Sequence, residues 1–130
     1  MDILFLDANI LFSAAYNKNS ALKIFWELQA KLMSSDYAEN EAERNLFLDE
    51  QKLRLVHLMK SVELITNYPL DNIPANITLR KKDMPILAAA IAANASHLIT
   101  GDYRDFGKLF FKKIKTVTVL PPVEYLKKVS

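Results

Sequence analysis

Short apolar runs alternate along the chain with longer stretches that carry apolar residues at helical spacing. Residues 3–6 are apolar without any alternation, which is typical of a strand buried on both faces of a parallel sheet. Similar short runs predict further strands at residues 62–65, 97–100 and 117–120. The intervening stretches predict helices at residues 8–16, 20–33, 37–47, 51–60, 86–95 and 122–128.

This alternation of strands and helices predicts an α/β sandwich around a mainly parallel sheet. A length of 130 residues suits one domain, and we expect residues 1–130 to form it. Residues 67–76 are rich in Pro, Asn and Asp and predict a loop rather than a domain linker. The longest apolar stretch, residues 85–93, is too short to span a membrane, and no signal peptide is visible, so we expect a cytoplasmic protein without membrane contact.

The composition restricts the chemistry that the chain can perform. It has no Cys, which excludes disulfides, thiolate metal sites and a thiol nucleophile. His57 and His97 are its only histidines, so a His-rich zinc site is excluded. Two glycines, Gly101 and Gly107, are too few for a glycine-rich phosphate loop. Metal chemistry would therefore depend on oxygen ligands, which favour hard ions such as Mg²⁺ or Mn²⁺.

Three acidic residues lie at the ends of predicted strands or at the start of a predicted helix, where all three would reach the same edge of the sheet. Asp7 comes directly after the first strand, and Asp102 comes just after the strand at residues 97–100. Asp83 begins the helix that leads into that strand. Functional groups collect beyond the carboxyl ends of parallel strands, so we expect these acids to converge. The alternative is that each only caps a helix or forms a turn.

A fourth acid is expected from the helix at residues 37–47, where Glu39, Glu41 and Glu43 compete. Glu41 falls within the apolar arc of that helix, Glu39 lies just outside it and Glu43 lies well outside. An inward-facing carboxylate needs a partner, so Glu41 is our choice. The alternative is that Glu41 reaches water or pairs with Arg44. Phe47 does not fit the arc.

Four segments, in order, resemble the motifs of PIN-domain nucleases. They are residues 5–11 (FLDANIL), 35–46 (SDYAENEAERNL), 83–90 (DMPILAAA) and 98–106 (LITGDYRDF). The last resembles the Thr-x-Asp-x-x-Asp-Phe signature of the family. Residues 47–82 resemble only a variable connection.

The resemblance implies a three-layer α/β/α fold and metal-dependent endonucleolytic hydrolysis of RNA phosphodiester bonds. It implies catalytic, Mg²⁺- or Mn²⁺-binding roles for Asp7, Glu41, Asp83 and Asp102, with Asp105 as an accessory metal ligand. Asn9 and Thr100 match polar positions that support the site. Many small PIN proteins are VapC-like toxins, inhibited by a cognate antitoxin and often dimeric, so the resemblance implies an antitoxin partner and admits a homodimer.

Basic residues near the expected site predict how an RNA substrate would approach. Lys82 precedes Asp83, Arg104 lies between two acids, and Lys108 and Lys112 follow. The net charge of +2 is too small to indicate nucleic-acid binding by itself, and basic runs are usually solvated surface.

Two other functions compete with a nuclease. A phosphoacceptor receiver domain needs an Asp after a central strand near mid-chain, where this sequence instead predicts the helix at residues 51–60. A catalytically silent PIN-fold protein, acting as an RNA-binding or assembly module, would not need all four acids.

Overall fold

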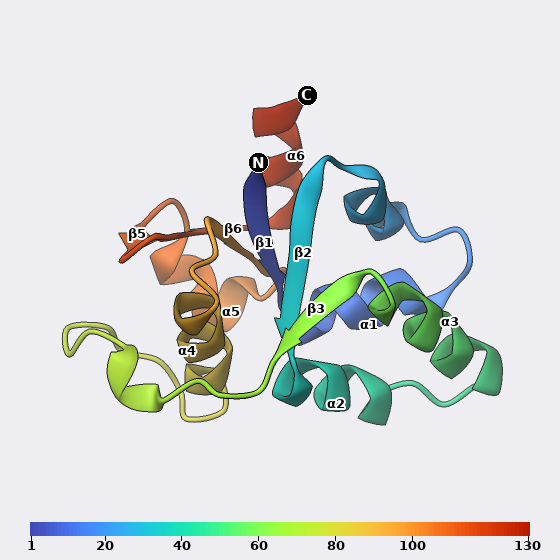
Figure 1. Ribbon diagram of the computed structural model, residues 1–130, viewed down its shortest axis with the longest axis horizontal. Helices are drawn as coiled ribbons and strands as arrows, with labels where there is room; N and C mark the ends of the chain where they lie inside the picture. Colours follow the sequence, from blue (N-terminus) through green and yellow to red (C-terminus); the bar gives the residue numbers. More distant parts are fainter.

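A computed structural model describes residues 1–130 and shows a six-stranded sheet in the order β3-β2-β1-β4-β6-β5 (Figure 1). All neighbouring strands are parallel except β5 and β6. The strands are β1 (Asp2–Leu6), β2 (Ala30–Ser35), β3 (Val62–Ile65), β4 (His97–Ile99), β5 (Lys113–Ile114) and β6 (Val117–Leu120). The predicted α/β sandwich around a mainly parallel sheet is thus confirmed.

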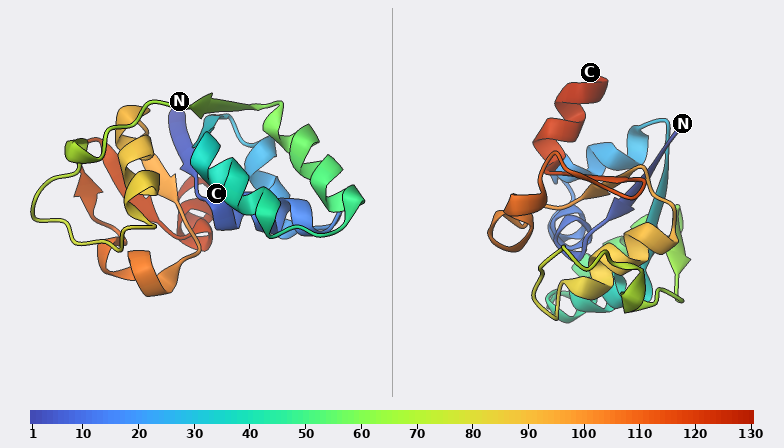
Figure 2. Two further views of the ribbon diagram at one scale, coloured as in Figure 1. Left: turned by 90° about the horizontal axis from the view of Figure 1, so that it is seen from below. Right: turned by 90° about the vertical axis from the view of Figure 1, so that its left-hand side faces the viewer.

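Helices connect these strands and cover both faces of the sheet. The α-helices are α1 (Ala8–Tyr16), α2 (Asp36–Arg44), α3 (Asp49–Met59), α4 (Met84–Ala92), α5 (Tyr103–Phe106) and α6 (Pro122–Val129). The shorter 3₁₀ helices are η1 (Ala21–Glu27), η2 (Leu70–Asn72) and η3 (Gly107–Leu109). The connections β1–α1–β2 and β3–α4–β4 run across the sheet in opposite directions. Because such crossovers are right-handed, α1 and α4 cover opposite faces. Figure 2 shows α4 apart from the cluster of α1, α2 and α3.

The core explains why these segments became these elements. Leu4, Phe5 and Leu6 are fully buried in β1, which has a parallel neighbour on each side. Helix α4 is apolar almost throughout and buries every residue from Ile86 to Ile91.

None of the helices combines the length and the apolar character that crossing a membrane requires.

The helix predicted over residues 20–33 is wrong. It divides into η1 and β2, and Leu32 and Met33 are buried as strand residues beside Leu4 and Phe5 of β1. The segment Ala30–Ser35 contains no β-branched residue, so its own propensity favours a helix. Pairing with β1 on one side and β3 on the other overrides that propensity.

Two smaller differences concern the ends of elements. Helix α2 ends at Arg44, and Phe47 is 85% exposed beyond it, which explains why Phe47 did not fit the helical arc. The short strand β5 was not predicted, because its two residues lie within a run of lysines that indicated only exposed surface.

Candidate metal centre

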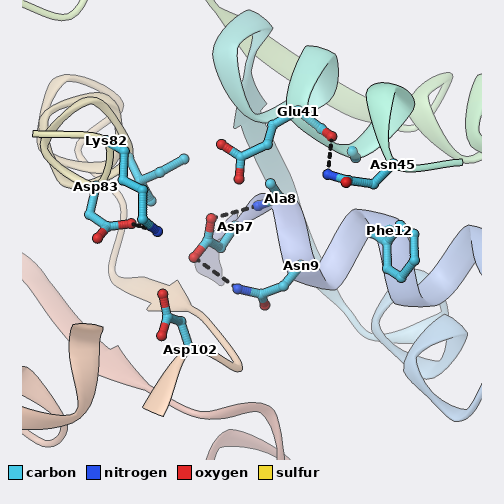
Figure 3. A pocket seen from close by; sticks show the side chains of 11 residues that line it. Asp7, Ala8, Asn9, Phe12, Glu41, Asn45, Lys82, Asp83 and Asp102 are labelled. Carbon is cyan, nitrogen blue, oxygen red and sulfur yellow. Dashed lines mark hydrogen bonds and ion pairs between the residues drawn. The ribbon is translucent and has the colours of Figure 1, made fainter. Parts of the chain in front are cut away.

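The carboxyl ends of β1 and β4 lie side by side at one edge of the sheet, opposite the edge where both chain termini lie (Figure 1). There the structure brings Asp7, Glu41, Asp83 and Asp102 together around one cavity of about 310 Å³, which we call the acidic pocket. Figure 3 shows their carboxylates directed toward a common space. Asn9 and Lys82 also line it. Four segments far apart in the sequence thus contribute to one pocket.

Asp7 is the most enclosed of these acids, with 5% of its surface exposed. Its Oδ1 accepts from the backbone N–H of Ala8 at 2.6 Å, and its Oδ2 accepts from the Thr100 hydroxyl at 2.7 Å and the Asn9 amide at 3.2 Å. Burial raises the pKa of Asp7, the hydrogen bonds from Thr100 and Ala8 oppose that shift, and the charges of Glu41 and Asp83 add to it, so that the pKa is about 6. Asp7 therefore both caps α1 and faces the pocket.

Thr100 and Asn9 hold the pocket's acids in place. The hydroxyl of Thr100 donates to Asp7 and accepts from the backbone N–H of Asp102 at 3.1 Å, so one buried side chain positions two acids. Asn9 Oδ1 accepts from the backbone N–H of Gly101 at 2.8 Å. A Cβ atom at Gly101 would lie 3.3 Å from that Oδ1, so a side chain there would crowd the contact.

Asp83 is buried at the start of α4, but its side chain makes no capping hydrogen bond. Its Oδ1 lies 3.4 Å from Lys82 Nζ, whereas its Oδ2 is buried without a hydrogen-bond partner. Burial raises the pKa of Asp83, and the charge of Lys82 opposes that shift. Asp83 thus occupies the N-cap position of α4, but its carboxylate does not cap the helix by a hydrogen bond and faces the pocket instead.

Asp102 and Asp105 complete a second group of carboxylates with Asp83. One oxygen of each of these three residues lies within 4.8 Å of those of the other two. Asp102 Oδ1 also accepts from the backbone N–H of Asp105 at 2.9 Å, so Asp102 does cap α5.

The side chain of Asp105 is clamped between two cations. Its Oδ1 lies 3.5 Å from an Arg80 guanidinium nitrogen, and its Oδ2 lies 3.1 Å from Lys82 Nζ. Burial raises the pKa of Asp105, but the neighbouring Lys82 and Arg80 outweigh that effect and leave the pKa below its usual value.

Glu41 is half-buried on α2 and lines the acidic pocket, as does its neighbour Ala42. Glu43 is exposed, and Glu39 is half-buried but does not line the pocket. The position expected for Glu41 from the helical arc is thus the observed one. Its role as a metal ligand stays a prediction.

The four basic residues expected to bind RNA lie in different places. Lys82 lines the acidic pocket, whereas Lys108 and Lys112 line a second cavity of about 580 Å³. Arg104 is exposed and lines neither cavity.

Two residues that arrange the pocket were not predicted from the sequence. Arg80 belongs to a basic run that was interpreted as surface, and nothing in the sequence indicated its pairing with Asp105. The Tyr37 hydroxyl donates to the Lys82 carbonyl at 2.7 Å and so attaches α2 to the segment before α4.

The donor set fits a hard divalent cation. Every candidate ligand is a carboxylate, as Mg²⁺ and Mn²⁺ prefer. The buried Asp83 Oδ2 without a partner is the kind of atom that an ion would satisfy. Acids packed this closely repel one another, and a bound cation would neutralise them.

Comparison with known proteins bears on the fold. No family model and no curated protein match the chain. Among solved structures, a chain of VapBC2 from Rickettsia felis, bound to a DNA fragment from the promoter, has a TM-score of 0.69 at 17% identity, over 92% of this chain and 98% of that one. A chain of VapBC-1 from nontypeable Haemophilus influenzae has a TM-score of 0.56 at 20% identity, over 92% and 97%. These similarities confirm the three-layer α/β/α, PIN-like fold.

Proposed function

We propose that this protein is an endoribonuclease that uses Mg²⁺ or Mn²⁺ to hydrolyse RNA phosphodiester bonds. The observation that carries the proposal is the acidic pocket, where Asp7, Glu41, Asp83 and Asp102 converge and Asp83 Oδ2 lacks a partner. The four acids are those that the resemblance to PIN nucleases implies. Neither histidine lines the pocket, so no imidazole base is proposed.

Each residue of the pocket has a definite part in this proposal. Asp7, Glu41, Asp83 and Asp102 would hold the cation, with Asp105 beside them. When bound, the cation supplies an activated water and neutralises charge on the phosphate oxygens. Thr100 and Asn9 fix the carboxylate of Asp7, so that it needs no rearrangement to act as a ligand. Lys82 carries a positive charge at the wall of the pocket, where it would attract the phosphate.

The test is RNA cleavage by the purified protein with Mn²⁺ and with EDTA. We expect cleavage only with Mn²⁺ and loss of activity in Asp83→Asn, which keeps the shape of the side chain but removes its charge. Asp71→Asn is the matched control, because Asp71 is exposed and lines neither the pocket nor the second cavity. Mn²⁺ should also raise the melting temperature of the wild type more than that of Asp83→Asn.

Two results would overturn the nuclease. Cleavage by Asp83→Asn at the wild-type rate would remove the pocket from the mechanism. RNA binding without any Mn²⁺-dependent cleavage would instead support a silent RNA-binding module.

We further propose that the enzyme is the toxin of a toxin–antitoxin pair and acts on cytoplasmic RNA. Support comes from the fold, which both VapBC complexes share. The expected antitoxin is a small protein encoded by a neighbouring reading frame, and co-expression with it should suppress cleavage and yield a stable complex. Undiminished cleavage in the presence of that protein would count against the toxin role. A homodimer is a further prediction of the resemblance, to be tested by sedimentation.

A further inference from the structure

A lysine ammonium contacts the carboxylates among which a metal ion would bind. Lys82 Nζ lies 3.4 Å from Asp83 Oδ1 and 3.1 Å from Asp105 Oδ2. These two acids and Asp102 form the group in which one oxygen of each lies within 4.8 Å of the others. The ammonium of Lys82 therefore already pairs with two of the three carboxylates in this part of the acidic pocket.

The partners of this ionic contact differ in their exposure to water. The side chains of Asp83 and Asp105 are 8% and 9% exposed, whereas that of Lys82 is 55% exposed. Buried carboxylates are poorly hydrated and need a partner of opposite charge. A half-exposed lysine can exchange such a partner for water at little cost. The two acids are thus the fixed members of the contact, and the ammonium is the exchangeable one.

The backbone places Lys82 at this position. The Tyr37 hydroxyl donates to the Lys82 carbonyl at 2.7 Å. The backbone N–H groups of Asp83 and Met84 both donate to the Arg80 carbonyl, at 2.9 Å and 3.1 Å, which closes a turn around Lys82. Figure 3 shows the side chains of Lys82 and Asp83 next to each other at the wall of the pocket. The contact is therefore part of the fold.

The ammonium neutralises these acids only in part. Asp83 Oδ2 is buried and still has no hydrogen-bond partner. Asp105 has a second cation, because its Oδ1 lies 3.5 Å from an Arg80 guanidinium nitrogen. A divalent ion carries twice the charge of Lys82, so it would compete successfully for Asp83, but against an opposing positive charge.

We propose that Lys82 is an internal counter-ion of Asp83 and Asp105 that competes with the divalent cation. In the metal-free protein its charge reduces the repulsion between the two acids. The same charge opposes metal binding and raises the cation concentration at which the site fills. Lys82 is therefore a positioning residue that acts through Asp83 and Asp105. This inference rests on the proposed metal-dependent function and adds its regulation by the cation concentration.

The first experiment measures Mn²⁺ affinity without RNA, by titration calorimetry at pH 8, where the carboxylates are ionised. The test variant, Lys82→Met, removes the charge and keeps most of the side-chain length. Lys81→Met is the matched control, because Lys81 is exposed, forms no ion pair and does not line the acidic pocket. Lys82→Arg tests whether a retained charge restores the wild-type affinity.

We expect Lys82→Met to bind Mn²⁺ about tenfold more tightly than the wild type, since a unit charge about 4 Å from a divalent ion has an effect of this order even in water. Lys81→Met should change the affinity by less than about twofold, because solvent and salt screen its charge. Lys82→Arg should stay within about threefold of the wild type, because the opposing charge is retained.

A second measurement separates this role from a purely structural one. Urea unfolding is followed in EDTA and in saturating Mn²⁺. Lys82→Met should be less stable than the wild type in EDTA, because Asp83 and Asp105 lose a counter-ion. Saturating Mn²⁺ should narrow that difference by the amount that corresponds to the gain in affinity, since binding to the native state adds stability according to the dissociation constant. A lysine that only packs would cost the same in both conditions.

Three results would overturn the inference. They are equal or weaker Mn²⁺ binding by Lys82→Met, equal gains in Lys82→Met and Lys81→Met, and a stability cost that Mn²⁺ does not change. Each of them leaves metal-dependent cleavage intact. Absence of Mn²⁺ binding in both the wild type and Lys82→Met would overturn the metal centre and the inference together. Tighter binding by Lys82→Met in a protein that never cleaves RNA would contradict the proposed nuclease and support the counter-ion.

Discussion

At the scale of single residues, the pocket is organised by groups that serve two purposes. Asp7 caps α1 and faces the pocket, and Asp102 caps α5 and does the same. The alternatives considered from the sequence, cap or site, therefore do not exclude one another at these two positions. Asp83 differs from them. Its carboxylate makes no capping hydrogen bond, and its Oδ2 atom has no hydrogen-bond partner. Lys82 lies 3.4 Å from its other oxygen and burial raises its pKa, and a bound cation would neutralise it further.

Glu41 gives the sharpest residue-level prediction, because α2 offers a matched control. Glu41→Gln should lower RNA cleavage by about 100-fold or more, since even residues that only orient metal ligands cost 10–100-fold when they are replaced. Glu43→Gln makes the same chemical change on the exposed side of the helix and should stay within about twofold of the wild type. Cleavage rates with saturating Mn²⁺ measure both. Similar losses in the two variants would show that Glu41 acts only through net charge.

At the scale of elements, secondary structure was predicted correctly where the local hydrophobic pattern agrees with the tertiary packing of the segment. The unbroken apolar run of β1 and the apolar α4 are buried as expected, and the carboxyl ends of β1 and β4 bring Asp7 and Asp102 together. The prediction failed at β2, where residues with helical propensity are recruited by two neighbouring strands. Sheet pairing is a long-range property that periodicity within one segment does not contain.

The same distinction applies to the site. Glu41 was found because an inward-facing charge on a helix is visible from spacing alone. The clamp of Asp105 by Arg80 and Lys82 was not, because it joins the loop before α4 to α5 across a gap in sequence. The separation of Lys108 and Lys112 from Lys82 likewise required the path of the chain between residues 76 and 82.

The helix that carries Glu41 begins at a serine cap, and this yields an element-level prediction. Ser35 is fully buried, and its hydroxyl accepts from the backbone N–H of Ala38 at 3.1 Å. Ser35→Ala should lower the free energy of unfolding by about 1 kcal/mol, as the loss of such a cap usually does. Ser20→Ala removes a longer, 3.3 Å bond at the half-buried start of η1 and should cost less. Urea unfolding measures both, and equal costs would contradict a specific role for the cap of α2.

At the scale of the whole molecule, negative and positive side chains gather in two separate regions, one at the acidic pocket and one at the second cavity. The net charge is only +2, yet four acids surround one pocket and three lysines surround the cavity beside it. The pairs of Asp105 with Lys82 and Arg80 lie between these two regions. The small total charge therefore conceals one acidic and one basic region.

The cost of the acidic pocket should appear in the stability of the metal-free protein. Burial raises the pKa of Asp7 from an ordinary 3.8 to about 6, so the native state holds this proton more tightly than the unfolded chain. The stabilisation that the Asp7 proton provides is complete below pH 4. It is lost as the pH rises to about 6, by an amount of the order of 3 kcal/mol.

Asp7→Asn lacks this loss, so its free energy of unfolding minus that of the wild type should grow by a similar amount between pH 4 and 7. Urea unfolding in EDTA measures that difference, and shifts at His97 and Asp2 cancel in it because both proteins contain them. Added Mn²⁺ should reduce the difference at pH 7 by binding the ionised pocket of the wild type. Parallel stability profiles for the two proteins in EDTA would mean that Asp7 ionises in the folded state without cost, and that its burial is not the source of strain in the pocket.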